Sequence, residues 1–182
     1  MIFTEKEILL RDGTKCILRS PNEHDAEQML SYFLTVSEES YFMINYPEEI
    51  LFTEEEEKEL LIKKAESATD IMIAAVINNK IIGNSSLYCY CDKKKMRHRS
   101  CIGVAIEKEY QGKGLGDLLV RETILMAKQI GFSQIELGVF SDNEKALNLY
   151  KKYGFERWGC TRQAFLLKDG TFRDEIVMGL MI

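Results

Sequence analysis

Residues 104–116, VAIEKEYQGKGLG, run from an apolar strand through a short polar link into a turn with three glycines, and a periodic apolar helix follows. Glycines allow successive backbone N–H groups to converge. The N-terminus of a helix adds N–H donors that lack an intrahelical partner, together with a partial positive charge. The stretch therefore predicts a strand, turn and helix that bind a phosphorylated ligand such as a pyrophosphate.

Two other phosphate-binding turns fit this stretch poorly. The nucleoside-triphosphate loop ends in Gly-Lys-Ser/Thr, whereas Lys113 is followed by Gly114 and no magnesium-binding hydroxyl comes next. The dinucleotide fingerprint requires glycines spaced G-x-G-x-x-G near the start of a βαβ unit. Here Gly112, Gly114 and Gly116 alternate, deep in the chain. The first pattern is absent and the second is disfavoured.

The turn resembles the acyl-coenzyme A turn of the GNAT N-acetyltransferase superfamily, whose pattern Gln/Arg-x-x-Gly-x-Gly/Ala is matched by Gln111, Gly114 and Gly116. A second segment strengthens the resemblance. In the superfamily, a strand leads to a helix that opens at an asparagine, carries a tyrosine seven residues later and ends Tyr-x-x-x-Gly-Phe. Residues 135–140 supply that strand, and the helix pattern is matched by Asn143, Tyr150, Tyr153, Gly154 and Phe155.

The resemblance implies an α/β (α+β) fold in one domain over residues 1–182, with a mixed, mostly antiparallel central sheet flanked by helices. Periodicity and turn residues predict the elements. The predicted strands are residues 8–10, 16–19, 71–77, 81–90, 101–106, 135–140, 155–167 and 175–180. The predicted helices are residues 23–35, one opened by a capping box at Thr53, residues 115–130, and one opened by the capping box Ser141-x-x-Glu144.

Helical spacing also predicts which side chains pack inward. In the helix after the turn, the predicted stripe against the sheet is Leu118, Leu119, Leu125, Met126 and Ile130. In the helix after Ser141, the predicted buried residues are Ala146, Leu149, Tyr150 and Tyr153.

The resemblance further implies an activity, the transfer of an acetyl group from acetyl-CoA to a primary amine by direct attack in a ternary complex. It implies that the main chain of Val104 and Ile106 holds the pantetheine arm, that Asn143 bonds the same arm, and that Tyr150 protonates the departing thiolate. The residues implied to hold the pyrophosphate are Gln111, Gly112, Lys113, Gly114, Leu115, Gly116 and Asp117. The acceptor would be a small-molecule amine or a peptide N-terminus, and a homodimer is compatible with the family.

The role implied for Tyr150 agrees with simple chemistry. A phenol has a pKa near 10 and a thiol a pKa near 8.5, so tyrosine is protonated at neutral pH and can donate to a thiolate. Asn143 lies seven residues earlier, about two helical turns or roughly 10.5 Å along the axis. One side chain can therefore hold the arm while the other reaches sulfur.

The sequence identifies no general base. Residues 99–106 contain no carboxylate, although many relatives carry a glutamate on this strand. His98, Asp174 and Glu175 remain open alternatives. The missing carboxylate leaves a second hypothesis, a non-catalytic acyl-CoA-binding sensor on the same fold.

Composition and charge limit the partners and the cellular location that we expect for the protein. The net charge is −5, and the sequence lacks the apolar stretch of about 20 residues that a membrane span requires, so we expect neither a nucleic-acid nor a membrane partner. The basic run at residues 93–99 suits a solvated loop, with RNA binding or contact with a coenzyme phosphate as alternatives. Five scattered cysteines indicate reduced thiols and a cytoplasmic protein. Cys89 and Cys91 share one face of a predicted strand, and we expect no metal.

Overall fold

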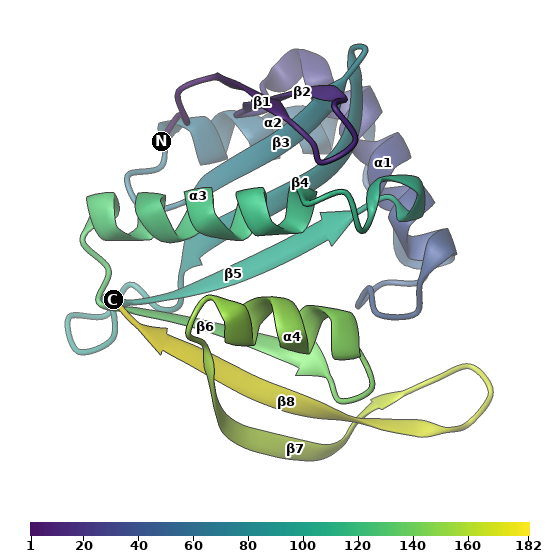
Figure 1. Cartoon of the computed structure of the whole chain (residues 1–182), viewed down its shortest axis with the longest axis vertical. Helices are drawn as coiled ribbons and strands as arrows, with labels where there is room; N and C mark the ends of the chain where they lie inside the picture. The colour runs from purple at the N-terminus through teal and green to yellow at the C-terminus, as the bar shows by residue number, and fades with distance from the viewer.

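The computed structural model describes residues 1–182 as one eight-stranded sheet with the order β1-β2-β3-β4-β5-β6-β8-β7 (Figure 1). Every neighbouring pair is antiparallel except β5 and β6, which confirms the mixed, mostly antiparallel sheet. The strands are β1 (Lys6–Leu9), β2 (Lys15–Arg19), β3 (Ile71–Ile77), β4 (Lys80–Cys89), β5 (Arg99–Ile106), β6 (Gln134–Phe140), β7 (Glu156–Leu166) and β8 (Phe172–Met181). The α-helices are α1 (Ala26–Glu39), α2 (Glu54–Glu66), α3 (Leu115–Ile130) and α4 (Glu144–Lys152).

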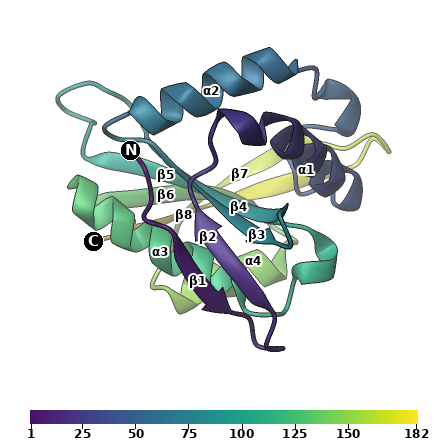
Figure 2. The same cartoon turned by 90° about the horizontal axis from the view of Figure 1, so that it is seen from above.

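The helices cover both faces of the sheet. Helices α1 and α2 lie together over one face, and α3 lies over the other face beside α4 (Figures 1 and 2). Strand β3 shows this division, because side chains alternate between the two faces of a strand. Met72, Ala74 and Val76 pack with α1 and α2, whereas Ile71 and Ile73 pack with α3. No helix in the chain combines the length and the apolar character needed to cross a membrane.

The predicted inward stripe of α3 is partly wrong. Leu125 is 46% exposed, while Leu118, Met126 and Ile130 are half-buried. At 100° per residue, Leu125 points roughly opposite Thr123. The side chains that are buried lie mainly four residues apart and are Leu115, Leu119, Val120, Glu122, Thr123 and Ala127. The helix ends at Gly131 (φ +95°), as its glycine predicted.

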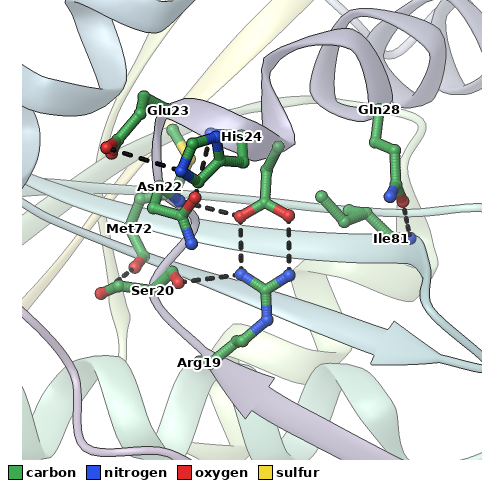
Figure 3. Close-up of polar contacts among 9 residues, drawn as sticks. Arg19, Ser20, Asn22, Glu23, His24, Gln28, Met72 and Ile81 are labelled. Atoms are coloured by element: carbon green, nitrogen blue, oxygen red, sulfur yellow. Dashed lines mark hydrogen bonds and ion pairs between the residues drawn. The ribbon is translucent and has the colours of Figure 1, made fainter.

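The first helical segment is fixed to the sheet by polar contacts at the end of β2 (Figure 3). The Arg19 guanidinium donates two hydrogen bonds of 2.7 Å to the carboxylate of Asp25, in the short 3₁₀ turn Glu23–Asp25 that precedes α1. Ser20 Oγ donates to the carbonyl of Met72 on β3 at 3.0 Å. Burial opposes ionisation of Asp25, but Arg19 and the amide of Asn22 outweigh it, so the pKa of Asp25 is lowered. This ion pair therefore sets where α1 begins on its face of the sheet.

Candidate active site

Strands β5 and β6 pair over only three residues and then diverge (Figure 1). The parallel ladder joins Arg99 to Gln134 and ends at Cys101 with Glu136. Both strands continue, β5 to Ile106 and β6 to Phe140. The edge of β5 beyond Cys101 therefore has no neighbouring strand on this side, and the centre of the sheet has an opening.

Hydrogen bonds to β4 show which groups of β5 face that opening. Glu107 donates to the carbonyl of Ile82, and the carbonyl of Arg99 accepts from Tyr90, both at 3.0 Å. In an antiparallel ladder, every second residue of a strand bonds to the same neighbouring strand, so the odd-numbered residues of β5 bond to β4. The N–H and C=O of the even-numbered residue Val104 therefore point away from β4 into the opening. Ile106 points the same way, but its carbonyl already accepts from the Gln111 side chain at 3.0 Å. Val104 thus presents both main-chain groups to the opening, and Ile106 presents chiefly its N–H; their predicted contact with the pantetheine arm stays a prediction.

The glycine turn leaves a row of main-chain donors without partners. Gly112 and Gly114 have φ values of +79° and +89°, and α3 begins at Leu115. Within the chain, no N–H of residues 112–117 donates a hydrogen bond, and Leu118 is the first to do so, to the carbonyl of Gly114 at 3.3 Å. Successive unpaired N–H groups at a helix N-terminus form an anion site. The turn predicted as a pyrophosphate cradle thus carries a row of unpaired N–H donors, and its binding of a phosphate stays a prediction.

Several cations surround this cradle, and the sequence indicated only Lys113. Arg11, from the turn between β1 and β2, donates to Asp117 Oδ2 at 3.0 Å, and Lys152, from the end of α4, pairs with the other oxygen. Lys113 pairs with Asp12 at 3.2 Å. Arg11 and Lys152 are far from the turn in sequence, so no local pattern could indicate them.

Gly116 has a packing role distinct from the two positive-φ glycines. A Cβ atom at this position would lie 3.1 Å from the Leu149 side chain of α4. Glycine therefore allows α3 and α4 to approach closely beside the opening.

Asn143 forms the N-cap of α4, which corrects the predicted capping box at Ser141. The Asn143 side-chain oxygen accepts from the N–H of Ala146 at 3.1 Å. The N–H of Ser141 is instead bonded to the carbonyl of Asp174 at 2.9 Å, so the chain is still held by β8 at that point. The amide NH₂ of Asn143 has no partner within the chain, and Asn143 lines the cavity described below.

Tyr150 is buried at 6% exposure, and its ring packs edge-on against Phe155 with centroids 5.4 Å apart. Its hydroxyl makes no hydrogen bond within the chain, although the residue lines the cavity. Burial raises the pKa of Tyr150 above that of a free phenol, so the hydroxyl stays protonated. Of the other residues predicted to be buried on α4, Ala146, Leu149 and Tyr153 are half-buried.

A cavity of about 890 Å³ joins the two faces of the sheet through the opening. On one side it is lined by Tyr150 and Asn143 of α4, and on the other by side chains of α1 and α2. Its floor includes Met72, Ser86 and Gly103, which face one another across β3, β4 and β5. The lining residues therefore come from both faces of the sheet, on either side of the opening between β5 and β6.

Three carboxylates line this cavity. Glu136 is held by Arg99, with Nη2 and Oε2 2.6 Å apart, and the hydrogen bonds from Arg99 lower its pKa. The side chain of Glu175 on β8 makes no hydrogen bond. It lies over Gly138 of β6, where a Cβ atom would collide with it. Glu57 of α2 is the third.

Of the three possible bases named from the sequence, only one lines the cavity. Glu175 lines the cavity, whereas Asp174 accepts from the N–H of Gln163 at 2.8 Å and does not line it. His98 lies in the loop between β4 and β5, also outside the cavity. Glu57 is one of four consecutive glutamates, and no pattern in the sequence distinguishes it from the other three.

Comparisons with known proteins agree with this geometry. The model of the acetyltransferase (GNAT) family matches residues 30–155. A GNAT-family acetyltransferase from Streptococcus pneumoniae has a crystal structure that is 32% identical, with a TM-score of 0.88 over 92% of this chain and 99% of that one. The structure of yncA from Salmonella typhimurium with its cofactor acetyl-CoA has a TM-score of 0.78 over 90% of this chain and 92% of that one; at 18% identity this shows the fold alone.

Among curated proteins, L-amino acid N-acetyltransferase AaaT of Escherichia coli (strain K12) is 30% identical over 107 residues, which are 58% of this chain and 65% of AaaT. The match thus spans just under two thirds of that relative. The match to the family model and the likeness to the S. pneumoniae enzyme over nearly its whole length confirm the resemblance read from the motifs. This chain belongs to the GNAT acetyltransferase family.

Proposed function

We propose that this protein is an N-acetyltransferase that moves the acetyl group of acetyl-CoA to a primary amine by direct attack in a ternary complex. The observation that carries this proposal is the cavity that crosses the sheet, with unpaired main-chain groups on one side and free carboxylates on the other. The names of two relatives support it: yncA was solved with acetyl-CoA as its cofactor, and AaaT is an L-amino acid N-acetyltransferase.

The donor would be held chiefly by main-chain atoms. The pantetheine arm would add to the free edge of β5 like a short strand, bonded to Val104 and to the N–H of Ile106. The amide NH₂ of Asn143 would bond the same arm. The pyrophosphate would take the N–H groups of residues 112–117, with Lys113 at the rim. Gln111 would act mainly through its bond to Ile106, which braces the turn.

The chemistry would be direct aminolysis of the thioester. The lone pair of a neutral amine attacks the carbonyl carbon, a C–N bond forms and the C–S bond breaks. Tyr150 would give its proton to the departing sulfur, since its buried hydroxyl is protonated and has no partner in the chain. Burial also disfavours an isolated thiolate, so a hydrogen bond from the phenol would stabilise the charge that develops on sulfur.

Glu175 is our candidate for the base that takes the proton from the amine. Glu136 is engaged by Arg99, whereas Glu175 carries no hydrogen bond and lies beside Gly138 at the opening. An ionised carboxylate accepts hydrogen bonds only, so it can receive an amine proton directly or through a water molecule.

The roof of the cavity favours a small-molecule amine over a peptide N-terminus as acceptor. The loop between α1 and α2 is joined to the β7–β8 turn, because the Tyr46 hydroxyl accepts from the N–H of Lys168 at 3.0 Å. The Lys168 ammonium also lies 4.1 Å from the centre of the Tyr46 ring and pairs with Glu48. These contacts join two loops beside the cavity, which would restrict the approach of a polypeptide.

The test combines binding with turnover. Calorimetry should show that the protein binds acetyl-CoA and coenzyme A, and a panel of small amines should include at least one that releases free thiol. Binding without thiol release from any amine would favour the sensor hypothesis. Failure to bind either coenzyme would refute the proposal.

A further inference from the structure

Two side-chain oxygens of the cavity are buried without any hydrogen-bond partner. They are Ser37 Oγ on α1 and Glu57 Oε1 on α2, and both residues line the cavity. The chain has one more such oxygen, Glu107 Oε1, but that carboxylate already binds Lys80 through its other oxygen at 2.7 Å. Glu57 is 3% exposed and forms no ion pair. Its carboxylate is therefore the one buried charge in the cavity without a partner.

The fold itself does not use this carboxylate. The N-terminus of α2 is capped by its neighbours, because Thr53 Oγ1 accepts from the N–H of Glu56 and the Glu56 side chain accepts from the N–H of Thr53. Burying a polar group without a hydrogen bond costs free energy, and a charge costs more. Burial accordingly raises the pKa of Glu57, an effect that Lys64 on the same helix partly opposes. Such a group is retained most readily where a ligand completes its contacts.

The register of the sheet indicates how far the part of the cavity beneath α2 lies from the free edge of β5. Met72, Ser86 and Gly103 form one row across β3, β4 and β5, and all three line the cavity. Strands are about 4.8 Å apart, so Met72, beneath α2, is on the order of 10 Å from the free edge of β5. The walls between are largely apolar, with Phe33, Leu60 and Met72 among them. An aliphatic chain suits this passage.

Resting on the proposed function, we propose that Ser37 and Glu57 bind a second, cationic nitrogen of the acceptor, so that the substrates are aliphatic amines with two positively charged groups. An ionised carboxylate only accepts hydrogen bonds and a hydroxyl can also accept, whereas an ammonium group offers three donors and a positive charge. The second nitrogen would lie under α1 and α2, side by side on this face of the sheet (Figure 2), while the first reaches the opening between β5 and β6. Lys64 also lines the cavity but forms no ion pair with Glu57, which leaves the carboxylate available.

The test compares 1,5-diaminopentane with pentylamine, which has the same carbon chain and lacks the second charge. Glu57→Gln keeps the size of the side chain and removes its charge. It should lower kcat/KM for the diamine about 10- to 150-fold, mainly through KM, the range expected for a hydrogen bond to a charged group. Turnover of pentylamine and binding of coenzyme A should change less than about twofold. Glu59→Gln, on the exposed side of the same helix, is the matched control and should change neither.

Two further measurements keep the result interpretable. The melting temperature of the Glu57→Gln variant should stay equal or rise, because an unpartnered buried charge is removed; a fall would indicate a structural role and overturn the inference. Calorimetric titration of 1,5-diaminopentane into the complex with coenzyme A tests the subsite without turnover. Binding that is absent in the wild type, or equal in both proteins, would also overturn the inference. Diamine binding that depends on Glu57, without thiol release, would refute only the proposed transferase activity.

Discussion

The two ends of the cavity are built differently. On the α4 side, the unpaired groups are mostly main-chain atoms: the edge of β5 beside the opening, and the N–H groups of residues 112–117 in the turn before α3. On the α1 and α2 side, they are side chains such as Ser37 and Glu57, which packing brings together. A main-chain site constrains backbone angles and so leaves glycines in the sequence, whereas a side-chain site leaves no local pattern. The first end can hold a ligand common to a family, and the second can differ from one member to another.

Among the variants that test this comparison, Tyr150→Phe should cause the largest loss of activity. Loss of the hydroxyl removes the proposed acid, so kcat should fall roughly tenfold to a few thousandfold, the usual range for a positioned acid. Binding of coenzyme A should change little, because the donor is held by main-chain groups. Steady-state kinetics and calorimetry on the same preparation measure both quantities. Turnover equal to that of the wild type would exclude Tyr150 as the acid.

Glu175→Gln tests whether the acceptor side supplies the base. The amide cannot take up the amine proton, so kcat/KM should fall roughly 10- to 100-fold for every amine that turns over. A loss confined to amines with a second charge would instead assign Glu175 to recognition.

Arg19→Met should destabilise the protein and affect the α1 end of the cavity, while leaving the coenzyme end unchanged. The variant leaves the buried carboxylate of Asp25 without its partner, at an expected cost of about 2–3 kcal/mol and a fall in Tm of roughly 5–10 °C. Because Arg19 fixes the start of α1, KM for the amine should rise, while affinity for coenzyme A should be retained.

The pH dependence of that stability difference provides a check. The folded pKa of Asp25 is lowered, so the stabilisation is complete above the unfolded pKa of about 3.9 and is lost as the pH falls through the folded value. Chemical denaturation of both proteins should show curves that converge in acid. A difference that persists unchanged below this range would contradict the role assigned to the ion pair.

The smallest effect should come from a matched pair of glycine substitutions. Gly114 and Gly170 have φ values of +89° and +80°, so alanine strains the backbone at either position by about 1–2 kcal/mol. Only Gly114→Ala should weaken binding of coenzyme A, by about 5- to 10-fold, because only this glycine shapes the cradle. Equal affinities in the two variants would show that the turn does not hold the donor.

The sequence carries more local information about the proposed donor side than about the acceptor side, for the same physical reason. Gly112, Gly114 and Asn143 lie where backbone geometry or a helix cap requires them: the two glycines form the turn before α3, and Asn143 caps α4 and lines the cavity. The order of strands and helices also followed from periodicity and turns, with errors at Leu125 and Ser141, where tertiary contacts decided the outcome. Arg11, Ser37 and Glu57 carry no local pattern, because their positions depend on elements that are distant in sequence.

The most direct measurement is an amide-resolved NMR titration of the labelled protein with coenzyme A. If main-chain donors hold the coenzyme, the N–H signals of residues 112–117 and of Val104 should shift together with a single affinity, while those of α2 around Glu57 stay unchanged. Saturable binding that leaves the signals of residues 112–117 and Val104 in place would contradict the main-chain site on which the proposed reaction depends.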